Sequence, residues 1–341
     1  MTENPPRLQL RAGAQVFVVT ADELQIVAVN HSTTFTSVPV VRLVVGLCEA
    51  LVDAPTRDEL AARVSEALGE ERALVEYVIE LMSQTGCLVA RDPAVPELDE
   101  RGRFYAALGL DPEATARTLA AARPLVVAPA ASADRITDAL AEVGVAAELV
   151  APAEGSTCGA ALDQVRAALE LAQGPIVAWD VPWRMPFARL LNDLAIERGR
   201  PILFGVCEGA IGRIGPYVLP RSTACLECVQ SRILANAGDN EVKVAQSYRA
   251  RLADRIPGPL PSHPAFRRAI ADLLAIELSQ ILLMRPPVTL GGFVEHTYGS
   301  ALSRRRAALK VPRCPSCHPA RPQRLAWDAN FPAPLVKSGA A

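Results

Sequence analysis

The sequence predicts a two-part α/β protein, with a winged-helix-like α+β domain first and then an α/β domain that has an open, largely parallel sheet and a four-cysteine metal site. Three observations lead to this prediction. The first ninety residues contain strand patterns and then helix patterns, whereas the middle of the chain alternates the two. Two C-x-x-C pairs, far apart in sequence, lie in the second half. The length of 341 residues also favours two cores over one.

The N-terminal domain is expected over residues 1–91. The β-branched runs AQVFVVT and ELQIVAVN, separated by a polar turn, predict a hairpin, and TTFTSV adds a short third strand. Helix periodicity follows in PVVRLVVGLCEALV, TRDELAARVSEALG and EERALVEYVIELMSQTG. Thr56 and Glu59 have the spacing of a capping box, and Gly86 is placed to end the third helix. CLVARD predicts a last strand.

Residues 92–122 mix proline, glycine and charge before an alanine-rich stretch, which predicts a linker and a short helix. The second domain is expected over residues 123–330. The segments RPLVVAPA, AAELVAP, GPIVAWD and RPILFGVCE predict strands, and helix patterns lie between them. HPAFRRAIADLLAIELSQILLM predicts a long helix, and VTLGGFVEHTYGSALSRRRAALKV predicts strands that return to the second cysteine pair.

Charge and composition narrow the classes of function. The formal net charge of −2 argues against nucleic acid as a partner. Residues 1–90 hold six Arg and Lys against twelve Asp and Glu, a local balance of −6. Asp272 and Glu277 interrupt the long apolar helix, so no membrane span is expected. The N-terminus MTENPPRLQL lacks a secretion signal, which predicts a cytoplasmic protein with reduced cysteines.

The paired cysteines predict a structural zinc site formed by Cys225, Cys228, Cys314 and Cys317. A two-residue gap lets both thiolates of a pair face one tetrahedral ion, and four thiolates leave no open position for catalysis. The alternatives are a redox pair, which needs only two cysteines, and an iron–sulfur cluster. A bound metal would close a loop of about ninety residues, so its removal should destabilise the second domain. The remaining cysteines, for which small buried hydrophobes are the usual role, are Cys48, Cys87, Cys158 and Cys207.

The segment FARLLNDLAIERGRPILFGVCEGAIGRIGPYVLPRSTACLECV resembles the core of the ubiquitin-activating-enzyme-like family of the ThiF/MoeB type. In that family a strand ends in aspartate, a following helix carries an arginine and an asparagine, and zinc cysteines follow. Asp180, Arg189 and Asn192 match this pattern, and the four paired cysteines match the zinc ligands. The resemblance implies a Rossmann-like fold over about residues 120–320 and a possible homodimer. It also makes Glu148 a conceivable ribose ligand, although a surface role is the alternative.

One departure from that family bears on ATP. Its members bind ATP through a glycine-rich loop after the first strand, because only glycine lets the backbone approach phosphates closely. This chain has VVAPAASADRI there, without glycine, and VPW follows Asp180. We therefore expect no ATP binding and no catalytic residues, with Asp180 and Arg189 serving the fold.

The segment LRAGAQVFVVTADELQIVAVN, followed by three helices, resembles the PqqD-like peptide-recognition element of enzymes that modify ribosomally made peptides. In that family a leader peptide adds as a strand to the sheet edge and presses apolar residues against the third helix. The resemblance implies that a leader peptide binds along the strand edge Thr33, Thr34, Phe35, Thr36 and Val38. On the third helix it implies contacts with Arg72, Val75, Ile79 and Met82. The alternative is that the apolar residues are simply core. The −6 balance favours apolar anchoring or a leader with basic residues.

Together the two parts resemble the partner proteins of azoline-forming cyclodehydratases, the C-protein or ocin-ThiF-like group. The resemblance implies a leader-binding, substrate-delivering component of a thiazole/oxazole peptide cyclodehydratase. Its catalyst would be a separate ATP-using YcaO-family protein, with a flavin-dependent dehydrogenase as a further candidate partner. The alternative is an adenylating ThiF/MoeB-type enzyme that activates a peptide or sulfur-carrier C-terminus. A winged-helix regulator with a metal-sensing domain is disfavoured by the acidic first part.

Overall fold

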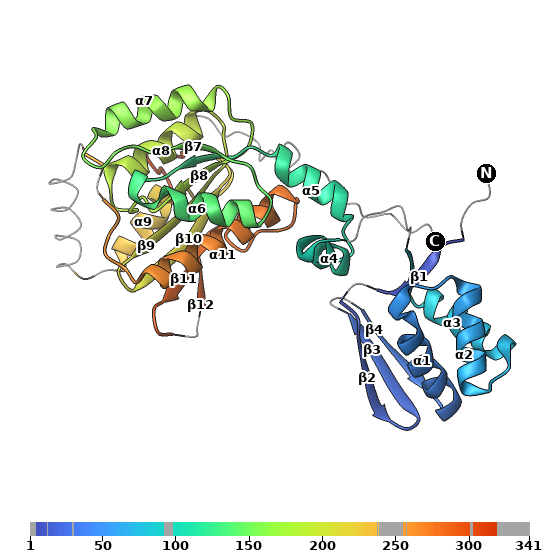
Figure 1. Cartoon of the computed structure of the whole chain (residues 1–341). Coiled ribbons are helices and arrows are strands. Elements are labelled where there is room, and N and C mark those ends of the chain that lie inside the picture. The colour runs from blue at the N-terminus through green and yellow to red at the C-terminus, as the bar shows by residue number, and fades with distance from the viewer. Residues whose placement is uncertain are drawn as a thin grey trace, which may run out of the picture. The chain divides into compact units, whose positions relative to one another are not determined.

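The computed structural model describes residues 5–11, 13–28, 31–91, 98–236, 238, 255–256, 258–300 and 303–318. The chain divides into two compact units, Met1–Ala116 and Arg117–Ala341. The division falls inside the segment 92–122 that the sequence marks as a linker and short helix. Figure 1 shows both units, each of which is described here by itself.

Unit 1 contains a three-stranded antiparallel sheet in the order β2–β3–β4, so that β2 and β4 are its two edges. Its strands are β2 (Gln15–Thr20), β3 (Glu23–Ala28) and β4 (His31–Thr36). A second, two-stranded sheet joins β1 (Arg7–Leu10) to β5 (Leu88–Arg91). The sequence did not predict β1, because four residues carry too little periodicity to identify a strand.

Unit 1 has three helices after the sheet, α1 (Val38–Ala50), α2 (Arg57–Leu68) and α3 (Arg72–Gln84); α1 contacts β3 and β4, and α2 and α3 contact α1 and each other. The predicted capping box is present, since the Thr56 hydroxyl accepts from the Glu59 N–H and the Glu59 carboxylate accepts from the Thr56 N–H. Val38 begins α1 and does not extend β4, so its placement on the strand edge is wrong. Proline at position 39 explains this, because proline is favoured in the first turn of a helix.

Unit 1 also contains α4 (Glu100–Ala107), and α5 (Pro112–Ala121) crosses the division between the units. The side chain of Asp99 caps α4 by accepting from the Gly102 N–H.

Unit 2 is built on a seven-stranded mixed sheet in the order β12–β11–β10–β9–β8–β6–β7. Strands β6 (Leu125–Val127), β7 (Glu148–Val150), β8 (Ile176–Trp179) and β9 (Ile202–Glu208) are parallel. Strands β10 (Ile211–Val218), β11 (Gly292–Thr297) and β12 (Ser303–Ala307) continue the sheet antiparallel. The prediction of a largely parallel sheet is therefore correct for one half only. Two residues, Gly209 and Ala210, join β9 to β10, and so short a connection requires an antiparallel pair.

Helices cover both faces of this sheet, as Figure 1 shows. On one face lie α6 (Ala130–Glu142) and α11 (Pro264–Leu282), which contact each other. On the other face are α7 (Cys158–Leu169), α8 (Pro186–Glu197) and α9 (Leu226–Ala235). Within the described residues, no helix combines the length and apolar character needed to span a bilayer.

Two glycines let α11 pack closely on the sheet. A Cβ on Gly205 of β9 would lie 2.5 Å from Leu274, and a Cβ on Gly212 of β10 would lie 2.4 Å from Ile270. Both distances are far below van der Waals contact, so side chains at these two positions are excluded by the buried face of α11. Because β9 and β10 each have a glycine at these positions, α11 can lie close to the sheet.

The substitution Gly212→Ala is expected to lower the free energy of unfolding by about 1–3 kcal/mol, because it overpacks the contact with Ile270. Urea denaturation of the full chain measures this. The control is Gly159→Ala in α7, where a Cβ meets no atom within 4 Å; replacing a helical glycine there should raise stability by about 0.5 kcal/mol. Equal effects at the two positions would contradict the packing argument.

Candidate functional site

The four paired cysteines come together in unit 2, and all are buried. Cys225 is the N-cap of α9 and Cys228 lies in its first turn, while Cys314 and Cys317 follow β12 in a short turn. The sulfur atoms of Cys225 and Cys314 are 3.7 Å apart and those of Cys228 and Cys317 are 3.5 Å apart. All four sulfurs lie within 4.8 Å of one another. In the described part of the chain, this is the only group of three or more His, Cys, Asp or Glu residues whose side chains could together hold a metal ion.

The spacing of the sulfurs suits a metal ion. Four ligands at about 2.3 Å from a tetrahedral centre lie about 3.8 Å from one another, and the Cys225–Cys228 sulfurs are 3.8 Å apart. Hydrogen bonds to Cys228 and Cys317, together with burial, raise the pKa of the Cys225 thiol. A bound cation would reverse this, because it stabilises the thiolates that buried thiols otherwise resist forming.

Backbone and side-chain hydrogen bonds fix the cysteine cluster. The Val311 N–H donates to the Cys228 sulfur at 3.3 Å. The buried Asn192 of α8 accepts from the Leu226 N–H at 3.0 Å and so holds the first turn of α9. Asn192 therefore supports the cysteine cluster, a role that its position in the sequence pattern did not identify. The cluster joins segments 89 residues apart, which is the arrangement expected of a structural site.

The purified chain is expected to carry one metal ion, and Cys314→Ser should lose it together with cooperative unfolding of unit 2, because three thiolates bind the ion more weakly. Elemental analysis by plasma mass spectrometry measures the stoichiometry and separates zinc from iron. The control Cys48→Ser changes a thiol of unit 1 that lies outside the cluster and should keep the metal. Full metal content in the Cys314 variant would exclude the cluster as the binding site.

The second group of candidate residues lies at the carboxyl end of β8. Asp180 is buried and adopts a left-handed backbone conformation with φ of 55°, which aspartate tolerates better than most residues. Its carboxylate accepts a hydrogen bond from the Cys207 N–H at 3.3 Å and forms an ion pair with Arg267 of α11. Burial raises the pKa of the Asp180 carboxyl, and the Arg267 guanidinium opposes that shift.

Arg267 fills the space in front of Asp180. Its guanidinium also donates to the Leu260 carbonyl and, at 2.9 Å, to the Ser262 hydroxyl. All three guanidinium nitrogens are thus used within unit 2, and the side chain is 11% exposed. The carboxylate of Asp180 is neutralised internally by a residue of α11 and does not face solvent.

The other residues that the sequence placed with Asp180 lie elsewhere. Arg189 is half exposed, and its Nε lies 3.8 Å from Asp193 and 3.9 Å from Glu227. Asn192 faces α9, as described above. Glu148 is exposed on β7 and lies 3.9 Å from Arg123. The structure therefore does not bring these side chains together into one site.

The turn between β6 and α6 uses several of its backbone donors in hydrogen bonds within unit 2. The Ala130 N–H donates to the Pro152 carbonyl at 3.2 Å, and the Ser132 N–H donates to the Pro129 carbonyl at 2.9 Å. The indole of Trp179 donates to the Ser132 carbonyl at 3.1 Å. A nucleotide-binding fold presents free N–H groups to phosphate at this helix N-terminus, and here two of those groups, on Ala130 and Ser132, already donate within the protein.

Asp180→Asn and Arg267→Gln are each expected to lower the free energy of unfolding by about 3 kcal/mol, because each leaves the other side chain buried without its charged partner. The double variant should lose much less than the sum of the two, and a double-mutant cycle by urea denaturation measures the difference. Additive losses would show that the two side chains do not act as a pair.

The candidate peptide-binding residues of unit 1 are only partly accessible. On β4, Thr34 and Thr36 are exposed, Thr33 is half-buried and Phe35 is buried in the core. On α3, Val75, Ile79 and Met82 are completely buried, in agreement with the alternative that they belong to the core. Arg72 is exposed and pairs with Glu76 at 2.7 Å and Asp58 at 3.0 Å.

Sequence reasoning missed the apolar residues of unit 1 that are open to solvent. On α3 these are Leu74 and Tyr77, which are 37% and 62% exposed. On the edge strand β2 they are Phe17, Val18 and Val19, each about half exposed. The sequence did contain a signal for them on β2. Successive side chains of a strand point to opposite faces of the sheet, so three apolar residues in a row cannot all face the core.

Comparisons with known proteins show the same fold. A scan against protein-family models found no match, and no curated protein matches. Among solved structures, the heterocyclase TruD is 19% identical and superposes with a TM-score of 0.58 over 92% of this chain and 43% of TruD. E. coli MccB with selenomethionine-labelled MccA is 12% identical, with a TM-score of 0.58 over 91% of this chain and 99% of MccB. This chain has their fold.

The coverage differs between the two groups of structures. A heterocyclase in complex with substrate and cofactor is 18% identical, with a TM-score of 0.58 over 92% of this chain and 39% of that protein. This chain therefore spans less than half of the length of either heterocyclase and nearly the whole length of MccB.

Proposed function

We propose that this chain binds the leader segment of a ribosomally made precursor peptide and delivers that peptide to a separate cyclodehydratase that forms azoline rings. The observation that carries the proposal is the outer edge of β4, which pairs only with β3 among the described strands, in a chain that shares its fold with TruD and MccB. An open strand edge is a common binding site for an extended peptide, whose main chain supplies most of the affinity.

The register of β4 shows which backbone groups are available. The Ser37 N–H donates to the Asp22 carbonyl, and hydrogen-bonded and non-hydrogen-bonded pairs alternate along an antiparallel ladder. Thr34 and Thr36 are therefore in non-hydrogen-bonded pairs with β3, and their N–H and C=O groups point outward. The exposed apolar side chains Leu74 and Tyr77 of α3 are the accessible anchors for a leader with apolar residues.

In this proposal unit 2 has no adenylating activity and its cluster holds structural zinc. The ion pair between Asp180 and Arg267 and the occupied donors at the start of α6 support the first statement. Four buried cysteine sulfurs at tetrahedral spacing support zinc, for which this ligand set is common. The ring-forming chemistry would come from a YcaO-family partner that uses ATP, since more than half of TruD lies outside the match to this chain.

The likeness to MccB favours a second candidate function, adenylation of a peptide C-terminus. One MccB structure contains ATP and matches 92% of this chain at a TM-score of 0.57. A pyrophosphate-exchange assay on the chain separates the two functions. We expect no exchange above background, and exchange that Asp180→Asn abolishes would establish the adenylating function instead.

Thr34→Pro is expected to weaken leader binding by about tenfold, because it removes an outward N–H while leaving the ladder to β3 intact. Fluorescence polarisation of fluorescein-labelled leader peptides, synthesised from short reading frames beside the gene, measures this on the full chain.

The matched control is Val18→Pro, which removes an outward N–H from the opposite edge strand β2 and should leave binding unchanged. Loss of binding in the Val18 variant alone would place the peptide on the other edge. The absence of binding at about 100 μM peptide would exclude the leader-binding function.

A further inference from the structure

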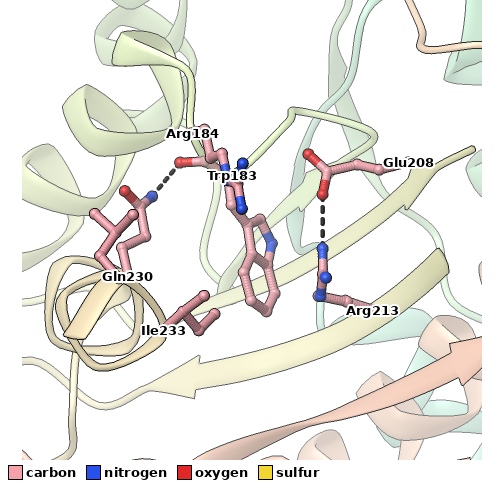
Figure 2. A pocket seen from close by; sticks show the side chains of 7 residues that line it. Trp183, Arg184, Glu208, Arg213, Gln230 and Ile233 are labelled. Atoms are coloured by element: carbon pink, nitrogen blue, oxygen red, sulfur yellow. Dashed lines mark hydrogen bonds and ion pairs between the residues drawn. The ribbon is translucent and has the colours of Figure 1, made fainter. Parts of the chain in front are cut away.

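Two adjoining hollows lie on unit 2 beside α9 and the antiparallel half of the sheet. The first has an empty volume of about 400 Å³ and the second of about 780 Å³. Arg213 of β10 and Ile233 of α9 line both, so the two form one depression, which we call the α9 groove. It shares no lining residue with the cysteine cluster or with the Asp180–Arg267 pair. Figure 2 shows the first hollow.

The α9 groove contains a buried hydrogen-bond donor without an acceptor. The indole of Trp183 is 2% exposed and lines the first hollow, and its Nε1 has no hydrogen-bond partner in the described part of the chain. The ring is fixed, because Phe293 packs edge-on at 5.1 Å and the Arg213 guanidinium lies 5.5 Å from its centroid. In Figure 2 the indole lies between Ile233 and Arg213. A rigid, unpaired N–H favours a ligand that brings an acceptor.

The charge of the α9 groove is positive. Four arginines line it against two glutamates. Arg213 pairs with Glu208 at 2.7 Å and with Glu295 at 3.1 Å, and Arg306 pairs with Glu295 at 3.4 Å, so these two arginines balance the two glutamates. Arg184 and Arg232 at the rim are exposed, and neither forms an ion pair with another described residue. Two guanidinium groups therefore remain available for carboxylates.

Apolar surface and an open strand edge complete the groove. Its floor includes Ile233, Phe293 and Ala308. Beside them runs β12, whose residues are all exposed and which pairs only with β11 among the described strands. Apolar floor, cationic rim and free main-chain groups suit an extended peptide better than a nucleic acid, for which two glutamates in the lining are unfavourable.

We infer that the α9 groove binds an acidic segment of a peptide in which carboxylate and apolar side chains alternate. Carboxylates would pair with Arg184 and Arg232, an acceptor would meet the Trp183 Nε1, and apolar side chains would cover the floor. The inference deepens the proposed function, on which it rests for the identity of the peptide: the −6 balance of residues 1–90 disfavours acidic segments at unit 1, and the groove supplies a place for them.

The test uses the full chain and a fluorescein-labelled peptide of alternating leucine and glutamate, compared with the same peptide carrying glutamine for glutamate. The glutamate peptide should bind about tenfold more tightly than the glutamine peptide, and the double variant Arg184→Gln, Arg232→Gln should remove that advantage. The control double variant Arg135→Gln, Arg166→Gln makes the same charge change at exposed positions on α6 and α7 and should retain it.

A second readout reports on the indole itself. The ¹⁵N–¹H signal of Trp183, identified by its loss in Trp183→Phe, should move on addition of the glutamate peptide. An unmoved signal would overturn the inference, as would equal losses in the two double variants. Binding of a single-stranded oligonucleotide as tight as that of the glutamate peptide would also overturn it, in favour of a general polyanion surface.

The Thr34→Pro variant separates the two proposals. It should bind the leucine–glutamate peptide like the unmodified chain, because it changes only unit 1. If Thr34→Pro leaves leader binding intact while the Trp183 signal still moves, the proposed role of β4 fails and the α9 groove stands. If the leader binds through Thr34 and the signal does not move, the groove fails and the proposed function stands.

Discussion

The buried cluster of four cysteines is the constraint on which much of unit 2 depends. It joins the first turn of α9 to the turn that follows β12, across 89 residues of chain. A metal bound there would hold these two distant segments together. The free energy of metal binding would offset the entropic cost of closing the loop between them during folding. The α9 groove is lined by α9 and by residues 306–308, which come shortly before the second cysteine pair, so the cluster joins the two segments that carry these walls.

The ion pair between Asp180 and Arg267 occupies the carboxyl end of β8. An aspartate at the end of a parallel strand is positioned for a ligand at the carboxyl edge of the sheet. Here an arginine from α11 occupies that position, and its other nitrogens are bonded to the Leu260 carbonyl and the Ser262 hydroxyl. The Arg267 guanidinium therefore neutralises the Asp180 carboxylate and also connects α11 to the end of β8.

Much of the fold followed from local signals, and the errors have physical causes. Capping at Thr56, the order of elements from β2 to β5 and the convergence of the four cysteines were predicted because each depends on spacing within a few residues or on ligand chemistry. The antiparallel half of the sheet was missed, because strand direction depends on connection length and not on strand composition. Arg267 was not identified at all, since it lies 87 residues from Asp180 and nothing in its neighbourhood marks it as the partner of a buried carboxylate.

Val75, Ile79 and Met82 were correctly placed on a helix. Over so short a helix, however, periodicity does not distinguish the buried face from the accessible face that carries Leu74 and Tyr77.

The edge strand β2 has a consequence for the behaviour of the protein in solution. It exposes Phe17, Val18 and Val19, and its sequence contains neither a charged residue nor a proline. Among the described strands it pairs only with β3, so one row of its main-chain groups has no partner strand. Such an edge invites pairing with a second copy of itself. The excess of acidic residues in this part of the chain opposes that encounter, because two copies repel each other at a range set by ionic strength. Apart from the irregular register between Val18 and Thr20, the acidity of unit 1 is therefore what keeps this strand from pairing with a second copy, and added salt weakens that repulsion.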